Sequence, residues 1–332
     1  MEKLKMGVLG CSVHYAKRIA VPMLESLLIE PYAIASRDLR KSEEFARRWG
    51  FTKAYGSYEE LLQDKDIDFI YNPLPNHLHL PWIKKAADAG KPILCEKPLT
   101  LNAQEAQDAA EYCAKRKVPL MEAFMYRFHP QWQHARDLVR SGEIGSLMAT
   151  HCVFTYNNRD PRNIRNIAEY GGGALLDIGC YAVSSARFMM GQEVERVFCT
   201  MQRDPEFKTD ILVSGILDFG AGKRSTFTVG TQLFSNQRFD AYGTGGSLSI
   251  EIPFNMYNDV SGRIHVATDV GRRIVETEIV DQYLLEFDSF ARAILEKTEV
   301  PTPISDAINN MAMLDALKKS AETGLWCEVE KR

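Results

Sequence analysis

The stretch Pro92-Ile-Leu-Cys-Glu-Lys-Pro98 points most directly to the fold of this chain. A short apolar run ends in Glu96 and Lys97, and a proline follows at once. This pattern is typical of a buried parallel strand that delivers an ammonium group to the carboxyl edge of a sheet, where open α/β sheets bind ligands. Because lysine is costly to bury without a partner or a task, we expect Lys97 to carry chemistry.

Strand-like and helix-like segments alternate on both sides of this stretch. The expected strands are residues 5–10, 32–36, 67–73, 93–96 and 119–124, and helices are expected through 24–28, 43–49, 58–63 and 103–115. The continuous apolar run 67–73 fits a strand that is buried on both faces. This alternation predicts an α/β fold that begins with a doubly wound parallel Rossmann sheet over residues 1–125.

A different pattern begins after about residue 128. Long alternating runs occupy 148–156, 194–202, 210–218, 225–232 and 247–252, with helices expected at 132–140, 174–190, 283–296 and 305–320. Alternation with glycine-containing turns is typical of antiparallel strands. We therefore expect residues 126–332 to form an α+β domain with a large, mostly antiparallel open sheet. The late helix at about 303–322 is expected to pack back toward the first domain.

The composition excludes several classes of protein. A net charge of −4 with 25% charged and 45% hydrophobic residues gives no indication of nucleic acid or an anionic membrane as partner. No apolar run approaches the roughly 20 residues of a membrane span, and we find no secretory signal pattern. The seven scattered cysteines form no C-x-x-C pair, which favours a cytoplasmic protein without disulfides and without a bound metal.

The first predicted strand ends in Gly7-Val-Leu-Gly10-Cys11-Ser12. A turn here that opens a helix would present backbone N–H groups to a pyrophosphate. The G-x-G-x-x-G fingerprint is imperfect, because Ser12 and Tyr15 replace its second and third glycines. An ordinary strand–helix turn is the alternative interpretation. We expect Gly10, Cys11 and Ser12 to contact a dinucleotide.

The second strand ends in Ser36 and Arg37, where an NAD enzyme would carry an acid for the ribose 2′-hydroxyl. A hydroxyl and a guanidinium suit a 2′-phosphate instead, and Lys41 adds charge one turn later. A solvated basic patch is the alternative, although basic residues oppose the dipole at a helix start. The sequence therefore predicts NADP in preference to NAD.

The third buried strand leaves the sheet through Asn72-Pro-Leu-Pro-Asn76, whose two prolines force an irregular path. We expect Pro73, Leu74 and Asn76 beside the cofactor, with Asn76 also capping the next helix. His79 either contacts the ribose or bonds a backbone carbonyl, and both roles stay open. A H-x-H pair without a third ligand nearby is poor support for a metal site.

Asp177 and Tyr181 lie four residues apart on the helix expected after Gly171-Gly-Gly173, and so share one face. A phenol with a pKa near ~10 needs a nearby ammonium to exchange its proton at neutral pH. Lys97 could supply that charge to Tyr181, and Asp177 could orient Lys97 or hold a sugar hydroxyl. Whether Lys97 or Tyr181 carries the proton stays open. A structural alternative buries Tyr181 between domains and pairs Asp177 with a cation.

Five stretches resemble the glucose–fructose oxidoreductase / inositol dehydrogenase / rhizopine-catabolism (Gfo/Idh/MocA) family, and the likeness spans nearly the whole chain. They are Met6-Gly-Val-Leu-Gly-Cys11, Ala35-Ser-Arg37, Glu96-Lys-Pro98, Met121-Glu-Ala-Phe-Met-Tyr-Arg-Phe-His-Pro130 and Gly171-Gly-Gly-Ala-Leu-Leu-Asp-Ile-Gly-Cys-Tyr181. Many members carry histidine where Tyr181 stands. The tyrosine resembles the NADP-linked branch of D-xylose dehydrogenases, dimeric dihydrodiol dehydrogenases and sugar 3-ketoreductases. The segment 11–15 is about one residue longer than usual.

The resemblance implies a nicotinamide held over Glu96, Lys97 and Pro98, with the Lys97–Pro98 bond often cis. It implies an NAD(P)-dependent dehydrogenase or reductase acting on a CH–OH group of a sugar or cyclic polyol, assembled as a homodimer or homotetramer through the C-terminal sheet. A nucleotide-sugar 3-ketoreductase and a trans-dihydrodiol dehydrogenase are alternatives. A nicotinamide-binding sensor without turnover is a more remote one.

Further substrate contacts are expected from side chains that suit a polyhydroxylated ligand. The candidates are Arg127, His129, Asn163 and Arg165. Each is also compatible with an ordinary loop or interface role. Phe154, Tyr156 and Phe234 could stack on a sugar ring, although aromatic residues in strands usually belong to the core.

Overall fold

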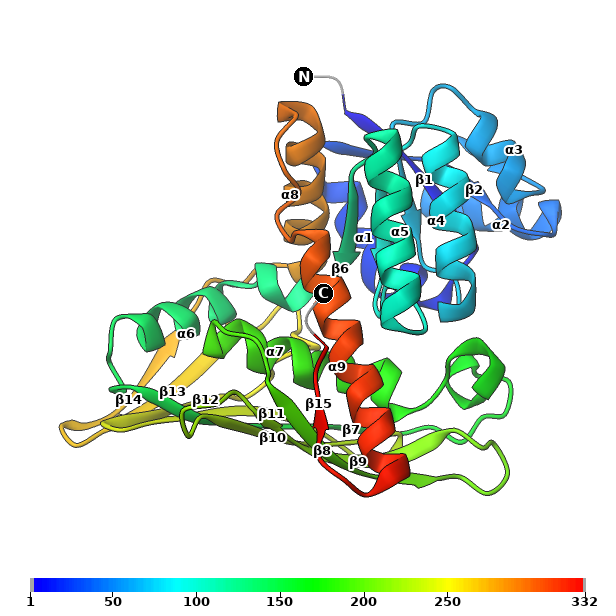
Figure 1. The fold of residues 1–332 in the computed structure, drawn as a ribbon. Helices are drawn as coiled ribbons and strands as arrows, with labels where there is room; N and C mark the ends of the chain where they lie inside the picture. Colours follow the sequence, from blue (N-terminus) through cyan, green and yellow to red (C-terminus); the bar gives the residue numbers. More distant parts are fainter. Residues whose placement is uncertain (1–2, 331–332) are drawn as a thin grey trace. The chain divides into compact units, whose positions relative to one another are not determined.

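The computed structural model describes residues 3–330, which divide into two compact units. The first comprises Met1–Phe124 and Tyr283–Ile308, and the second comprises Met125–Gln282 and Asn309–Arg332. Each unit contains its own sheet (Figure 1). This division departs from the expected one late in the chain, because the helix at 282–296 belongs almost entirely to the first unit. The later helix, expected at about 303–322, belongs for most of its length to the second unit.

The first unit is built on a six-stranded parallel sheet in the order β3-β2-β1-β4-β5-β6. Its strands are β1 (Leu4–Leu9), β2 (Ile29–Ala35), β3 (Lys53–Tyr55), β4 (Phe69–Asn72), β5 (Ile93–Glu96) and β6 (Leu120–Ala123). This confirms the predicted Rossmann sheet. In such a sheet, ligands bind where the strand order reverses, here at the carboxyl ends of β1 and β4.

Helices cover the faces of this sheet. They are η1 (Tyr15–Ile19), α1 (Ala20–Glu25), α2 (Leu39–Trp49), α3 (Tyr58–Gln63), η2 (Asn76–Leu78), α4 (His79–Asp88), α5 (Ala103–Arg116) and α8 (Gln282–Glu296). The side chains of Asp38, Ser57 and Asn102 accept backbone N–H groups at the starts of α2, α3 and α5, as N-caps do. Asn76 does not cap α4 as expected, because it lies inside the preceding 3₁₀ turn η2.

Helix α8 belongs to the first unit because it packs on β4. Its Phe287 and Phe290 meet Tyr71 and Phe69, with ring centroids 4.9 and 5.7 Å apart. All four aromatic side chains are fully buried. A helix more than 200 residues away in the sequence therefore completes the core of the nucleotide-binding sheet.

The first helix of the chain opens with the π-helical turn η1. The hydroxyl of Ser12 accepts the N–H of Tyr15 at 3.0 Å and so starts the helix. A π-turn accommodates one residue more than an α-turn, which accounts for the extra residue seen in the sequence. Tyr15, at the third glycine position of the fingerprint, is fully buried against Phe45, Phe51 and Tyr71.

The second unit is built on a nine-stranded sheet in the order β14-β13-β12-β11-β7-β10-β9-β8-β15. The strands are β7 (Leu147–Asn157), β8 (Arg196–Arg203), β9 (Asp210–Asp218), β10 (Arg224–Gly230), β11 (Gln232–Gly243), β12 (Gly246–Ile250), β13 (Arg263–Thr268), β14 (Gly271–Glu276) and β15 (Cys327–Glu328). Among the described strands of this sheet, only the β7–β10 pair is parallel. The prediction of a large, mostly antiparallel sheet is confirmed, although it omitted β11, β13, β14 and β15.

Helices and short turns of the second unit are η3 (Met125–Phe128), α6 (Pro130–Arg140), η4 (Ile164–Asn166), η5 (Ala168–Tyr170), η6 (Leu175–Gly179), α7 (Cys180–Met190) and α9 (Ile304–Thr323), the last of which begins in the first unit. Figure 1 shows α6 and α7 on the same face of the nine-stranded sheet. On β9, Val213 and Leu217 are buried, whereas the alternate residues Leu212 and Ile216 are partly exposed. One face of the sheet thus holds the core and the other faces outward.

Within residues 3–330, every helix is too short or too polar to cross a membrane.

Candidate active site

Gly10 marks the carboxyl edge of the Rossmann sheet. Its φ of +94° is a left-handed conformation that favours glycine. Its N–H bonds the carbonyl of Ala35 at 2.9 Å and joins the ends of β1 and β2. A Cβ here would lie 3.0 Å from Leu74 and 3.5 Å from the Tyr58 hydroxyl. Glycine therefore lets the turns after β1 and β4 meet at the reversal of strand order.

Basic side chains stand beside this turn. Arg37 and Lys41 are exposed, whereas Ser36 is buried and its hydroxyl accepts the N–H of Asp38 at 3.1 Å. Burial raises the pKa of Tyr58, and the guanidinium of Arg37 opposes that rise, which places the two side chains near each other. Tyr58 was not singled out from the sequence, since nothing distinguishes it from an ordinary first residue of a helix.

His79 joins the loops that follow β4 and β5. Its Nε2 lies 2.7 Å from the carbonyl oxygen of Leu74, and its Nδ1 lies 2.9 Å from that of Pro98. The ring is fully buried, and this burial lowers its pKa. Of the two roles left open by the sequence, the structure therefore favours the bond to backbone carbonyls over a contact with ribose. The Lys97–Pro98 peptide bond, directly after β5, is cis.

Glu96 accepts the hydroxyl of Tyr71 at 2.7 Å and lies 3.3 Å from Nε2 of His14. Burial alone would raise the pKa of Glu96, but the neighbouring His14, the charge of Lys97 and the hydroxyl of Tyr71 together outweigh it and lower the pKa to about 2. Glu286 on α8 is also buried. Its pKa is raised well above the usual range, first by burial and then by the charge of Glu96. The pKa values of these two neighbouring carboxyl groups are thus shifted in opposite directions.

Neither His14 nor Glu286 was predicted from the sequence. Glu286 occupies a buried position of α8 with Phe287 directly after it. A carboxylate within an otherwise apolar helix face is the signal that could have identified it.

In the second unit, one carboxylate oxygen of Asp177 accepts two hydrogen bonds. Tyr156 donates its hydroxyl to Oδ2 at 2.6 Å, and Arg165 donates its Nε–H to the same atom at 2.9 Å. The charge of Asp177 is the main cause that raises the pKa of Arg165. Burial, followed by the charge of Asp177, raises the pKa of Tyr156. The site therefore holds a carboxylate between a cation and a neutral phenol.

The triple glycine brings Arg165 to this carboxylate. Gly173 has a φ of +115° and donates its N–H to the carbonyl of Arg165 at 2.9 Å. Gly172 donates to the carbonyl of Ile167 at 3.1 Å. A Cβ at Gly172 would lie only 2.5 Å from the carbonyl oxygen of Arg165. The absence of side chains here lets the loop press against the start of η6, which carries Asp177.

Tyr181 lies in α7, directly after the π-helical turn that contains Asp177. Its hydroxyl contacts the sulfur of Met125 at 3.4 Å, and its ring packs on Phe154 and Phe254 with centroids 5.7 and 5.1 Å apart. Only 5% of Tyr181 is exposed. Its effect on the pKa of Arg165 places the phenol near the Asp177 cluster.

The remaining substrate candidates make structural contacts. Arg127 donates to the hydroxyl of Ser184 at 2.7 Å. His129 caps α6, and burial lowers its pKa to about 4. Asn163 accepts the N–H of Arg165 at 3.1 Å and so shapes the loop. Of the four candidates, only Arg165 is joined to Asp177 by a described bond.

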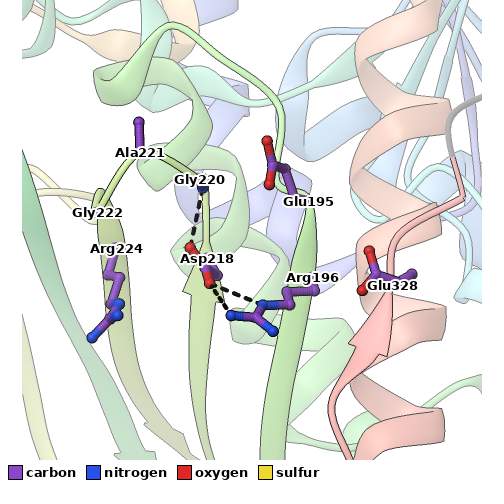
Figure 2. Close-up of a pocket in the computed structure, with 8 residues that line it drawn as sticks. All are labelled: Glu195, Arg196, Asp218, Gly220, Ala221, Gly222, Arg224 and Glu328. Atoms are coloured by element: carbon purple, nitrogen blue, oxygen red, sulfur yellow. Dashed lines mark hydrogen bonds and ion pairs between the residues drawn. The ribbon is translucent and has the colours of Figure 1, made fainter.

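A surface hollow of about 420 Å³ in the second unit contains none of the predicted site residues. Figure 2 shows its lining of Glu195, Arg196, Asp218, Gly220, Ala221, Gly222, Arg224 and Glu328. Arg196 and Asp218 form an ion pair across 3.0 Å. A mixed-charge hollow of this kind lacks the convergent polar groups and apolar walls of a typical ligand pocket.

Comparison with known protein families shows that the two halves of the chain match two domains of one family. Residues 4–124 match the model described as an oxidoreductase family with an NAD-binding Rossmann fold, and residues 132–249 match the Gfo/Idh/MocA C-terminal domain. D-xylose 1-dehydrogenase (NADP(+)) 2 of Haloferax volcanii is 37% identical, over 98% of this chain and 100% of that protein. Trans-1,2-dihydrobenzene-1,2-diol dehydrogenase of Xenopus tropicalis is 36% identical, over 73% of each protein.

The fold also matches a solved structure over nearly its whole length. This is the 3-ketoreductase of Actinomadura kijaniata in complex with NADP and TDP-benzene, with a TM-score of 0.92 and 28% identity over 96% of this chain and 98% of that one. The chain accordingly belongs to the Gfo/Idh/MocA oxidoreductase family and is an NAD(P)-dependent oxidoreductase.

Proposed function

We propose that the protein transfers a hydride between NADP and a carbinol or keto carbon of a sugar or cyclic polyol. The observation that carries this proposal is the carboxylate of Asp177, held by Arg165 and Tyr156 in the turn that leads directly into α7 and Tyr181. A fixed carboxylate and guanidinium suit vicinal hydroxyl groups, because one accepts and the other donates hydrogen bonds. The 37% identity to a D-xylose dehydrogenase supports the same substrate class.

The preference for NADP rests on the basic residues after β2. Arg37 and Lys41 are exposed beside the turn that follows Gly10, and an arginine at this place accommodates a 2′-phosphate. The D-xylose dehydrogenase is named for NADP, and the 3-ketoreductase was solved with NADP. Within the cofactor site we assign Gly10, Cys11 and Ser12 to the pyrophosphate. We assign Pro73, Leu74 and Asn76, which follow β4, to the opposite side of the cofactor site.

Bound NADP would supply the hydride acceptor or donor, and the protein would handle the proton. We assign to Tyr181 the transfer of the hydroxyl proton, and to Lys97 a hydrogen bond to the substrate oxygen together with stabilisation of the phenolate. Asp177 would hold a neighbouring hydroxyl. Structures of the Actinomadura 3-ketoreductase include a Tyr-to-Phe and a Lys-to-Ala mutant, each with TDP-benzene and NADP. These are the residue types assigned here.

A substrate panel tests the proposal. Pentoses, hexoses, inositols and trans-dihydrodiols would each be offered with NADP⁺, and the nicotinamide absorbance would be followed. We expect turnover with at least one sugar or cyclic polyol and slower turnover with NAD⁺. If no sugar or polyol is oxidised, and none of the corresponding ketones is reduced with NADPH, the proposed substrate class is wrong.

Tyr181→Phe tests the assignment of the proton. Removing a general acid/base typically slows turnover by about 10²–10⁴-fold, whereas the affinity for NADPH, measured by fluorescence, should stay near that of the wild type. Phe154→Leu, next to the same ring, is the matched control for packing. Normal turnover by Tyr181→Phe would transfer the role to Lys97.

A nucleotide-sugar 3-ketoreductase is the second candidate, favoured by the TM-score of 0.92 to the enzyme solved with TDP-benzene. A TDP-linked 3-keto sugar with NADPH would distinguish the two. Faster turnover of that substrate than of any free sugar would replace the first proposal.

We also propose that the protein is a cytoplasmic homodimer or homotetramer. All seven cysteines are free, and six of them are buried, as in proteins kept in a reducing compartment. The outward face of the nine-stranded sheet carries partly exposed apolar residues such as Leu212 and Ile216, which suits a contact between copies.

A further inference from the structure

Asp210 lies under the start of the helix that carries the proposed active-site residues, and no motif in the sequence marks it. It is the first residue of β9 and only 7% exposed. Its Oδ2 accepts the N–H of Leu175 at 2.6 Å. Leu175 begins η6, which holds Asp177 and leads directly into the α7 residue Tyr181. The first N–H groups of a helix have no partner within it, so this bond fixes where the helix begins.

The glycine run fits closely around the same carboxyl group. The Cα of Gly173 faces Oδ1 of Asp210 so closely that even a Cβ could not be placed there. On its other side, Gly173 donates its N–H to the carbonyl of Arg165. Asp210, Gly173 and the backbone of Arg165 therefore form one continuous set of contacts. A change in the position of the Asp210 oxygens would move both partners of the Arg165–Asp177 pair.

The charge surroundings of Asp210 are mixed. Burial raises its pKa, and the N–H of Leu175, the charge of Lys318 and that of Arg203 oppose the rise. Burial and Asp177 are the larger causes of the raised pKa of Tyr156, and Asp210 acts in the same direction. Asp210 thus acts on the candidate site in two ways, through the position of its oxygen atoms and through its charge.

We propose that Asp210 is a positioning residue that sets the geometry of Asp177, Arg165 and Tyr181 by holding the start of η6. Its position, rather than its charge, is what the site requires. Only the predicted effect on kcat rests on the proposed function. The structural part concerns the order of the 173–181 segment and can be measured without any substrate.

Two substitutions separate position from charge. Asp210→Asn keeps a carbonyl oxygen in place and removes the charge, whereas Asp210→Glu keeps the charge but pushes the carboxylate by one methylene against Gly173. Asp218→Ala serves as a matched control. Asp218 is the last residue of the same strand, is equally buried, and bonds the N–H of Gly220 and Arg196 away from the predicted site residues (Figure 2).

Hydrogen exchange followed by mass spectrometry gives the substrate-free readout. Asp210→Glu should speed amide exchange in the peptide containing residues 173–181, Asp210→Asn should leave it near the wild-type rate, and Asp218→Ala should speed exchange only around residues 218–224. Unchanged exchange in Asp210→Glu would overturn the proposal. This result is independent of whether the substrate panel succeeds.

Kinetics with the best substrate of the panel gives the second readout. A displacement of about 1 Å at a reacting group can cost about 10²-fold in rate. We therefore expect kcat to fall about 10- to 100-fold in Asp210→Glu, with the NADPH affinity unchanged. Asp210→Asn and Asp218→Ala should stay within about threefold of the wild type, well below that loss. If Asp210→Asn loses as much as Asp210→Glu, charge and not position is required, and the proposal fails.

Discussion

Single residues at the carboxyl edge of the Rossmann sheet are the ones that we propose select NADP over NAD. Arg37 is exposed beside the turn after Gly10, and its guanidinium is near enough to Tyr58 to affect the pKa of that phenol. Of the donors predicted for a 2′-phosphate, Ser36 already bonds Asp38. We therefore expect Arg37 to be the principal source of discrimination between NADP and NAD.

Arg37→Ala should remove most of the preference for NADPH over NADH, because the planar guanidinium supplies charge-assisted bonds to a phosphate. Fluorescence titration with both nucleotides measures this preference. Arg40→Ala, an exposed change three residues later, should preserve it. Equal affinities for the two nucleotides in the wild-type protein would refute the NADP assignment.

The unequal pair Glu96 and Glu286 predicts a pH-dependent stability. The pKa of Glu286 is raised in the folded protein, so its stabilising contribution is complete below the unfolded value of about 4.3. That contribution is lost as the pH rises through the folded value. The charge of Glu96 acts on Glu286, and that of Glu286 acts on Tyr71; His14 lies 3.3 Å from Glu96 and beside the ring of Tyr283.

Glu286→Gln should therefore unfold at higher urea concentration than the wild type at pH 8, and the gap should shrink toward pH 4.5. The amide has the shape of the acid but does not ionise. Urea unfolding at several pH values measures the difference. Glu296→Gln, an exposed position on the same helix, should show no such trend. A gap that is independent of pH would contradict an ionising Glu286.

At the level of elements, the loop before η6 and the helix that follows it act together. Gly172 has no room for a side chain because of the Arg165 carbonyl. Gly172→Ala should lower kcat by about 10-fold or more through displacement of Arg165 from Asp177. Gly245→Ala is the control, since Gly245 is not in the left-handed region and a Cβ there would meet no atom closer than 3.6 Å. Equal kcat values in both variants would show that the loop does not position Arg165.

Several elements could be predicted from local patterns, and others could not. Five strands of the Rossmann sheet were predicted because each is a short apolar run between turn residues, whereas the three-residue β3 (Lys53–Tyr55) was missed. Strand β11 was missed because residues 233–236 at its start are exposed, and bulged in register, rather than alternating. The two π-helical turns have no sequence signature. The bond from Tyr156 to Asp177 joins a strand and a helix start 21 residues apart, a contact that periodicity does not reveal.

For the whole molecule, the open sheet face is the feature that bears on assembly. Ile216→Glu would place a charge among the partly exposed apolar residues of that face. We expect the wild type to elute as a dimer or tetramer with light-scattering detection, and Ile216→Glu to shift toward the monomer. Ile279→Glu, at a 58% exposed position outside the sheet, should not shift. A monomeric wild type would refute the proposed assembly.

The family and both fold classes could be predicted from sequence, whereas the course of the late chain between the units could not. Amphipathic helices near 283–296 and 305–320 were correctly located, but periodicity does not say which sheet a helix covers. The contacts of Phe287 with Tyr71 and of Phe290 with Phe69 join residues more than 200 positions apart, which no local pattern in the sequence indicates. Helix α8, which was expected in the domain of residues 126–332, instead belongs almost entirely to the first unit.

The return of α8 to the first sheet has a consequence for biosynthesis. When the ribosome has synthesised residues 1–282, the helix α8 that packs on β4 has not yet been made. The core of the first unit can therefore be completed only after most of the second unit has been synthesised. A truncated gene product ending near residue 282 would leave the rings of Phe69 and Tyr71 uncovered. Grafting this nucleotide-binding half onto another protein would require two separate pieces of the gene.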